Sequence, residues 1–230
     1  MLGHELLKSI QSIATPQNVA AMLRHAERHA ISDPAQPMLA ELTTNGIAAA
    51  KALGERITGF QHLRLFHSPV KRCRQTAENI AEGAAKSGIF VELIGPQEAL
   101  GVSYIQDLAE AGHMHHKHGD DFIRLWFTGQ VPTSIILSPD GIATRKIVHV
   151  SQHLAEETSH GRRLDLHVSH DWNIIIMREL LLGVQHEQAG WLNFLDGVAF
   201  SQTKEGILTA IYRNEHRSCN LPWDQFIRRA

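Results

Sequence analysis

The sequence predicts an α/β fold with a mostly parallel central sheet. Short apolar runs of strand length alternate along the chain with longer segments whose apolar residues recur at helical spacing. Strands alternating with helices are typical of a parallel sheet in which helices cross over between neighbouring strands. The length of 230 residues allows one sizeable core with an elaboration, or at most two small domains. Since no linker is evident, we expect residues 1–230 to form a single domain.

The first half of the chain alternates strand and helix regularly. An apolar run stops abruptly at Arg24, as a buried strand does. The helix that follows opens with a threonine that can cap it, and the next helix ends at Gly88. The predicted elements are, in order, a strand over 19–23, a helix from about 42 to 59, a strand over 63–66, a helix over 70–87 and a strand over 90–94.

The second half loses this regularity and then regains it. Residues of about 95–140 have no clear period, and we expect an insertion or lid over the sheet with a helix around 122–127. The elements predicted after it are a helix over about 141–158, a strand over 164–168, a helix over 172–182 and a hairpin of strands 198–201 and 207–211.

Charge and cysteine content exclude several classes of protein. Twenty-two basic and 24 acidic residues give a net charge of −2, which supplies no general attraction to nucleic acid or to an anionic membrane. Any site for an anion must therefore be local. The two cysteines, Cys73 and Cys219, form neither a disulfide framework nor a zinc-ribbon pattern, so we expect a reducing compartment.

The first 18 residues predict a short amphipathic helix with Leu2, Leu6, Ile10 and Ile13 on one face. They contain no apolar core of signal-peptide length. No run in the chain approaches the ~20 apolar residues of a membrane span. We therefore expect a cytoplasmic protein.

Polar clusters follow three of the predicted strands directly. They are Arg24-His25, His67-Ser68 and His170-Asp171. Ligands of open α/β sheets bind outside the carboxyl ends of the strands, so these clusters are expected to converge. Arg24 and Arg28 bracket His25 and could cradle a dianion, although such arginines could also pair with surface carboxylates. A positive clamp, a nucleophile and a proton donor are what phosphoryl transfer requires.

Four motifs occur in the chain in a fixed order. They are Arg24-His25-Ala26-Glu27-Arg28, Leu42-Thr43-Thr44-Asn45-Gly46, Ser68-Pro69-Val70-Lys71-Arg72-Cys73-Arg74-Gln75-Thr76-Ala77 and Val168-Ser169-His170-Asp171. Together they resemble the histidine phosphatase superfamily, which includes the phosphoglycerate mutases and the histidine acid phosphatases. The resemblance covers residues from about 19 to 212. It implies a three-layer α/β/α fold of the phosphoglycerate mutase type, and chemistry that uses no metal and no cofactor.

The resemblance implies a role for each matching residue. His25 would be the nucleophile and would form a phosphohistidine. Arg24, Arg28 and Arg72 would bind the phosphoryl oxygens, and His170 would hydrogen-bond the same group and stabilise charge as the phosphoryl moves. Ala26 replaces the usual glycine and adds one methyl group near the phosphate.

Arg72 matches the family better than Arg74 does, because the family's arginine sits just before a small residue, here Cys73. Positions two apart on a helix point about 200° away from each other, so only one of these arginines should face the site. Arg74 is then expected at the surface. Cys73 is expected to be a buried small residue.

The general acid is left open between Asp171 and Glu98. In the resembled family, mutase-like members commonly have glycine after the second histidine and take their acid from elsewhere. The acid phosphatase branch instead carries His-Asp, with the aspartate as proton donor. Asp171 could also be a plain N-cap of the helix over 172–182. Glu98 lies in the region where mutase-like members place their acid.

Other polar residues are candidates for contacts with the rest of the substrate. Asn173 could contact hydroxyl groups, and His115 or His118 an anionic group. The cluster of His113, His115, His116 and His118 is predicted to be a solvated loop near the entrance. No carboxylate or cysteine spacing completes a metal site there.

The predicted function is a metal-independent phosphatase that hydrolyses a phosphomonoester through a phosphohistidine at His25. A sugar phosphate or another small metabolite is the favoured substrate. The first alternative is a phosphomutase of the same fold. The second is a non-catalytic phosphate-binding protein, which is disfavoured because no predicted catalytic position is missing.

Overall fold

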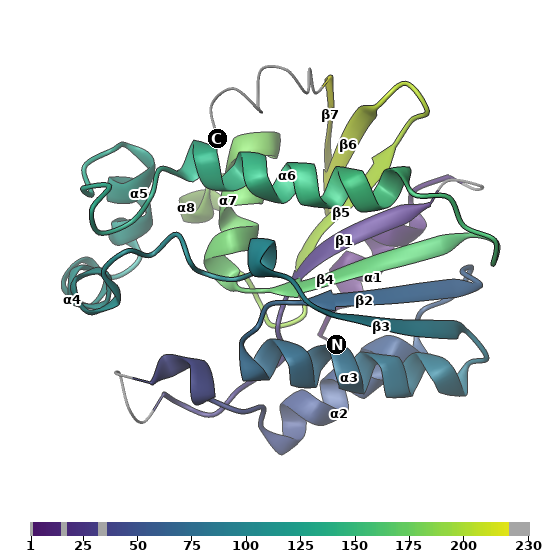
Figure 1. Cartoon of the computed structure of the whole chain (residues 1–230). Helices are drawn as coiled ribbons and strands as arrows, with labels where there is room; N and C mark the ends of the chain where they lie inside the picture. The colour runs from purple at the N-terminus through teal and green to yellow at the C-terminus, as the bar shows by residue number, and fades with distance from the viewer. Residues whose placement is uncertain (1, 15–17, 32–35, 221–230) are drawn as a thin grey trace.

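The computed structural model describes residues 2–14, 18–31 and 36–220 of the chain. Within these residues the centre is a seven-stranded sheet of order β3-β2-β4-β1-β5-β6-β7 (Figure 1). The strands are β1 (Val19–Arg24), β2 (His62–His67), β3 (Phe90–Pro96), β4 (Arg163–Ser169), β5 (Gly197–Gln202), β6 (Ile207–Tyr212) and β7 (Glu215–Asn220). The first four run parallel, and the last three add an antiparallel edge beside β1. The predicted α/β fold is confirmed. β7 is an element that the sequence did not predict.

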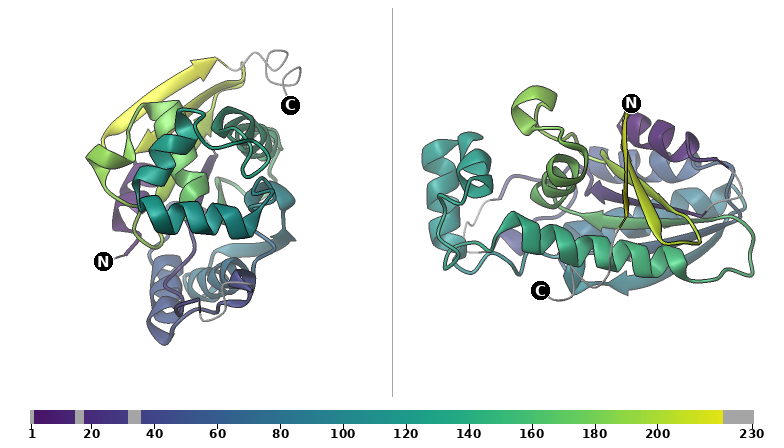
Figure 2. Two further views of the ribbon diagram at one scale, coloured as in Figure 1. Left: turned by 90° about the vertical axis from the view of Figure 1, so that its left-hand side faces the viewer. Right: turned by 90° about the horizontal axis from the view of Figure 1, so that it is seen from above.

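Helices cover both faces of the sheet and make three layers (Figure 2). One face carries α1 (His4–Gln11), α2 (Thr44–Glu55) and α3 (Lys71–Lys86), and the other carries α6 (Pro139–Ala155) and α7 (Asp171–Leu182). Alternate residues of β1 reach the two cores: Ala21 and Leu23 pack on the first side, Ala20 and Met22 on the second. Burial on both faces explains why the strand is a continuous apolar run.

The region between β3 and α6 holds the helices that were hardest to predict. They are η2 (Glu98–Leu100), α4 (Leu108–His118) and α5 (Asp121–Phe127). Both α4 and α5 lie beyond the edge of the sheet at which β4 ends and α7 begins, on the left in Figure 1. The prediction of a solvated loop is wrong for the four histidines from His113 to His118, which belong to α4. That the region of about 95–140 forms a lid over the site stays a prediction.

Two other boundaries differ from those predicted. α1 begins at His4, so Leu2 lies before the helix and is exposed, while Leu6, Ile10 and Ile13 are buried. α7 begins at Asp171 with His170 as its N-cap residue.

The described residues also form two short helices, η1 (Pro37–Leu39) and α8 (His186–Ala189). In the described part of the chain, no helix has the length and apolar character needed to span a membrane.

Candidate active site

The predicted nucleophile, His25, follows β1 directly at the edge where three strands end together. β4 lies between β1 and β2, with Arg24 opposite Ser169 and His67 opposite Val168. The chain that continues from each strand therefore reaches the same place. The structure brings together six of the predicted residues there: Arg24, His25, Arg28, Arg72, His170 and Asp171.

The His25 ring is fixed in one tautomer. Its Nδ1 lies 2.7 Å from the carbonyl oxygen of Ala26, and since a carbonyl can only accept, Nδ1–H is the donor. Nε2 therefore keeps its lone pair, and it accepts a hydrogen bond of 3.0 Å from Nε of Arg72. Burial and the positive charge of Arg72 lower the pKa of His25 to about 3. The imidazole is neutral at pH 7, with Nε2 available to attack.

Arg72 also reaches the second histidine of the site. Its Nη2 lies 3.2 Å from Nδ1 of His170, and its Nη1 donates to the carbonyl of Pro37 at 2.8 Å. Nε2 of His170 lies 2.9 Å from the hydroxyl oxygen of Ser68. Burial, Arg72 and His25 hold the pKa of His170 well below its usual value. Both histidines are thus neutral and joined through one guanidinium.

Arg74 lies on the same helix but outside the site. It is exposed and pairs with Glu78 at 3.6 Å, as the spacing on a helix requires. Cys73, between the two arginines, is fully buried, and burial raises the pKa of its thiol to about 12. A thiolate nucleophile at this position is therefore disfavoured.

Arg24 and Asp171 form the second pair of charges. Nη2 of Arg24 lies 2.9 Å from Oδ2 of Asp171, its Nη1 donates to the carbonyl of Leu192, and its guanidinium lies 4.2 Å from the ring centre of Phe194. Asp171 also accepts from the indole N–H of Trp191 at 3.3 Å. The N-cap residue of α7 is His170, and Asp171 follows it in the first turn, where its Oδ1 accepts from the backbone N–H of Trp172 at 3.0 Å.

The site holds more positive than negative charge. Burial is the largest cause that lowers the pKa of Arg24 and of Arg72, and the charge of Arg28 lowers both further. Arg28 lies three residues after His25 on the same loop, and its Nη1 donates to the carbonyl of His29 at 2.8 Å. Among the described residues, the site combines the guanidiniums of Arg24, Arg28 and Arg72 with the carboxylate of Asp171, which leaves a surplus of two positive charges beside neutral histidines. Such a surplus suits a phosphate dianion.

Contacts beneath the site hold the loop after β1 in place. The backbone N–H of Ala26 donates to the hydroxyl of Thr76 at 3.0 Å, and that hydroxyl donates to the carbonyl of Arg72 at 2.7 Å. Gly46 packs directly on the same loop, because a Cβ there would lie 2.0 Å from the carbonyl oxygen of Glu27. The glycine of the Leu-Thr-x-x-Gly motif therefore lets the loop that carries His25 and Arg28 pack closely against α2.

Two further predicted residues, Glu98 and Asn173, make contacts of other kinds. Glu98 is exposed on η2 and lines a separate cavity of about 30 Å³ with Tyr104 and Lys146. Asn173 is fully buried, and its amide donates to the carbonyls of Leu100 and Gly101 and to the hydroxyl of Ser169 at 2.8–3.1 Å. It ties α7 to the segment after β3.

His115 is the member of the histidine cluster that turns inward. Its ring packs on Trp172 and Trp191, with centroids 5.6 and 6.3 Å away, and its Nε2 has no hydrogen-bond partner among the described residues. Through Trp191 this aromatic group adjoins Asp171. His115 is thus near the acidic side of the site.

Ser68 belongs to the cluster His67-Ser68 that was expected to converge on the site. Sequence reasoning missed Trp191 and Phe194 as parts of it. Their position follows from β5, which pairs antiparallel with β1, so that the start of β5 lies where β1 ends. The predicted hairpin could have suggested this only if its pairing with β1 had been known.

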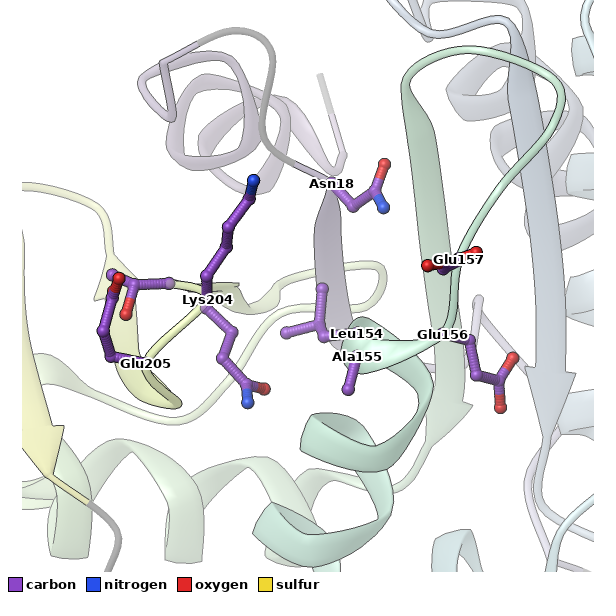
Figure 3. Close-up of a pocket in the computed structure, with 9 residues that line it drawn as sticks. Asn18, Leu154, Ala155, Glu156, Glu157, Lys204 and Glu205 are labelled. Atoms are coloured by element: carbon purple, nitrogen blue, oxygen red, sulfur yellow. The ribbon is translucent and has the colours of Figure 1, made fainter.

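A larger cavity of about 740 Å³ lies at the opposite end of the sheet, where β1 and β4 begin (Figure 3). It is bounded by Asn18 before β1, by the end of α6 and by the β5–β6 turn, and its charged residues are Glu156, Glu157, Lys204 and Glu205. None of the predicted site residues lines it. The cavity is therefore separate from the convergence of arginines and histidines.

The chain matches one known family over most of its length. The family model described as the histidine phosphatase superfamily (branch 1) matches residues 21–202. No curated protein matches the chain.

Several solved structures share the fold at low sequence identity. A mycobacterial glucosyl-3-phosphoglycerate phosphatase in complex with inorganic phosphate is 18% identical, with a TM-score of 0.56, over 80% of this chain and 89% of that one. A phosphoglycerate mutase from Bacillus anthracis is 16% identical, with a TM-score of 0.57, over 85% and 93%. A putative alpha-ribazole-5'-P phosphatase from Escherichia coli is 16% identical, with a TM-score of 0.54, over 86% and 96%. With the family model covering most of its length, this chain belongs to the histidine phosphatase superfamily.

Proposed function

We propose that the protein is a phosphomonoesterase that works through a covalent phosphohistidine at His25. The observation that carries the proposal is the neutral, buried imidazole whose Nε2 faces Arg72 within a group of three arginines. A neutral nitrogen nucleophile inside a positively charged pocket suits attack on a phosphate ester.

In the proposed first step, the phosphoryl group binds between Arg24, Arg28 and Arg72 and takes over hydrogen bonds that Arg72 makes to the two histidines. Nε2 of His25 then attacks phosphorus in line, and the bond from phosphorus to the leaving oxygen breaks. Nδ1–H stays on the carbonyl of Ala26 throughout, which keeps the ring oriented. Beside the dianion, His170 can take up positive charge that burial otherwise disfavours.

The leaving oxygen needs a proton, and we assign its delivery to Asp171. In the structure its carboxylate accepts from Arg24, so a bound phosphoryl group competes with it for that guanidinium. A phosphomonoester that binds as its monoanion transfers its proton to Asp171, which leaves the dianion between the arginines. Asp171 then passes this proton to the leaving oxygen. In the second step water attacks the phosphohistidine, the P–N bond breaks and Asp171 takes the water's proton.

A small phosphorylated metabolite is the proposed substrate class. Two of the similar structures are named for the hydrolysis of such compounds, a glucosyl-3-phosphoglycerate and an alpha-ribazole phosphate. On the side of Asp171, the site is bordered by Trp191, Trp172 and His115. These rings offer a surface for the leaving group.

The test of the proposal is phosphate release from an aryl phosphate in the presence of a chelator. We expect His25→Ala to lower turnover by at least about 10⁴-fold, because the residue that forms the intermediate is gone. His29→Ala is the matched control, since His29 is exposed four residues away, and it should keep wild-type turnover. Wild-type rates in a folded His25→Ala protein would refute the mechanism.

A second experiment addresses the acid. Asp171→Asn should slow hydrolysis by about 10²-fold for esters with poor leaving groups, and much less for aryl phosphates that leave without a proton. The measurement is kcat for a series of esters of increasing leaving-group pKa. Equal slowing along the series would remove Asp171 from the acid role, and Glu98→Gln tested in parallel shows whether that carboxylate has it.

A further inference from the structure

A second group of ionisable side chains lies away from the active site, where α7 meets α8. Glu179 belongs to the last turn of α7, and His186 and Glu187 open α8. One ligand atom from each residue lies within 4.8 Å of the other two. The side chains of Glu179 and His186 are 8% and 4% exposed, respectively.

The tautomer of His186 leaves a lone pair inside this group. Its Nε2 lies 3.1 Å from the carbonyl oxygen of Asp120, which can only accept, so Nε2–H is the donor. A neutral His186 then presents the lone pair of Nδ1 to Oε2 of Glu187 at 3.1 Å and to Oε2 of Glu179 at 3.8 Å. Neither Nδ1 of His186 nor Oε2 of Glu179 has a hydrogen-bond partner among the described residues. Buried lone pairs facing one another are costly unless a cation lies between them.

Arg124 supplies only part of the charge needed. It contacts Oε1 of Glu179 at 2.6 Å and both oxygens of Glu187 at 2.7 and 2.8 Å. These contacts orient the two carboxylates and leave Oε2 of Glu179 free. One guanidinium against two carboxylates leaves one negative charge in the group.

We propose that Glu179, His186 and Glu187 bind a divalent first-row metal ion such as zinc. One imidazole and two carboxylates are a donor set that zinc accepts. Two ligand atoms of a tetrahedral zinc ion lie about 3.4 Å apart, and the separations of 3.1 and 3.8 Å bracket that value. The hydrogen bond from Nε2–H to a backbone carbonyl is the usual support of a metal-bound histidine. Glu187 is 41% exposed, which leaves an entry path and a position for water.

The ion would be structural and would take no part in phosphoryl transfer. Glu179 lies eight residues beyond Asp171 on α7, which is about 12 Å along the helix. Metal bound there would join α7 to α8. Through the Asp120 carbonyl and Arg124 it would also hold α5 against them, and so fix the helices at the border of the active site (Figure 1).

The first test is zinc binding by equilibrium dialysis after chelator treatment of the full chain. We expect one tight site in the wild-type protein, weakened by at least about 100-fold in Glu179→Gln and in His186→Gln. Glu110→Gln and His113→Gln are the controls, because both residues are exposed on the histidine-rich helix α4, and these variants should keep the tight site. Loss of tight binding in the α4 variants but not in the others would assign the zinc to the surface histidines and overturn the proposal.

The second test remains informative if the variants are less stable. We measure the difference between the Tm values with zinc and with chelator for each protein. The wild-type and α4 variants should gain on the order of 5 °C at zinc concentrations about 100 times the Kd, and Glu179→Gln and His186→Gln should gain none. An equal gain in all five proteins, which would mean that zinc binds elsewhere, or no gain in the wild type would overturn the proposal.

Discussion

Two buried groups of charged residues lie at different places in the parallel part of the sheet and share strand β4. One is the active site at the carboxyl ends of β1 and β4, where the described residues include three arginines and one carboxylate, that of Asp171. The other lies among Arg64, Arg163 and Asp165, within β2 and β4. There Arg64 donates to both oxygens of Asp165 at 2.8 Å, and Arg163 donates to the same carboxylate at 3.2 Å.

The two groups differ in the acceptors to which their guanidiniums donate hydrogen bonds. Arg64 also pairs with Glu156, and Arg163 donates to the carbonyls of Glu156 and His153. In the active site, Arg72 donates instead to two neutral imidazoles and a carbonyl, and Nε of Arg24 has no partner among the described residues. A buried arginine matched by carboxylates stabilises the fold, whereas one matched by weaker acceptors remains able to bind an anion.

The largest effect should come from removing an unmatched arginine. Arg72→Gln is expected to lower kcat/KM by about 10³-fold or more, because a guanidinium that binds the transferring phosphoryl group is lost. Arg74→Gln, two residues along the same helix, should change kcat/KM by less than about twofold. Steady-state kinetics on one aryl phosphate compares the two. Equal losses would mean that the surplus charge at Arg72 has no special role.

Removing the acceptor of the matched group should act on stability instead. Asp165→Asn leaves two buried guanidiniums short of charge and should lower the free energy of unfolding by about 3 kcal/mol. Turnover per folded molecule should stay near that of wild type. Urea denaturation measures the first quantity, with Asp140→Asn as an exposed control. A larger effect on kcat than on stability would contradict the distinction drawn between the two groups.

The smallest effect concerns buried histidines and pH. Burial is the main cause that lowers the pKa of His149 to about 4, and it holds the pKa of His167 well below its usual value, as for His25 and His170. Between pH 4 and 6.5 the unfolded chain therefore binds protons that the folded chain does not. Stability is present above pH 6.5 and is lost on acidification, by up to about 1.4 kcal/mol per pH unit for each such histidine.

His149→Gln should make this dependence shallower, while His113→Gln, an exposed substitution, should leave it unchanged. The measurement is the free energy of unfolding at several pH values from 7 down to 5. A slope that is the same in all three proteins would show that His149 does not contribute.

Features that depend on local pattern were predictable from the sequence, and those that depend on pairing between distant segments were not. Apolar runs ending at Arg24, His67 and His170 are local, and with the motifs of the resembled family they indicated the strands and most of the site. The pairing of Arg64 with Asp165 is not local, since it exists because these residues lie opposite each other on β2 and β4. The sequence alone shows that Arg64 and Asp165 are charged residues within apolar strands, but it does not show that they pair.

The missed secondary structure has physical reasons of the same kind. α4 buries only Ala111, so the helix leaves no apolar stripe, and its histidines suggested a loop. β7 carries a polar sequence and forms because its backbone extends the sheet beside β6. Helix starts depend on single caps, so α7 began one residue earlier than expected.

The strand order also has a consequence for how the chain matures during synthesis. β1 and β2 are separated by β4, whose residues follow β2 by about a hundred positions. A nascent chain that has emerged only as far as α6 lacks the strand that lies between the two motifs carrying His25 and Arg72. The anion-binding pocket is therefore complete only after β4, and with it His170, has joined the sheet. Until then the motif arginines remain exposed to whatever anions surround the growing chain.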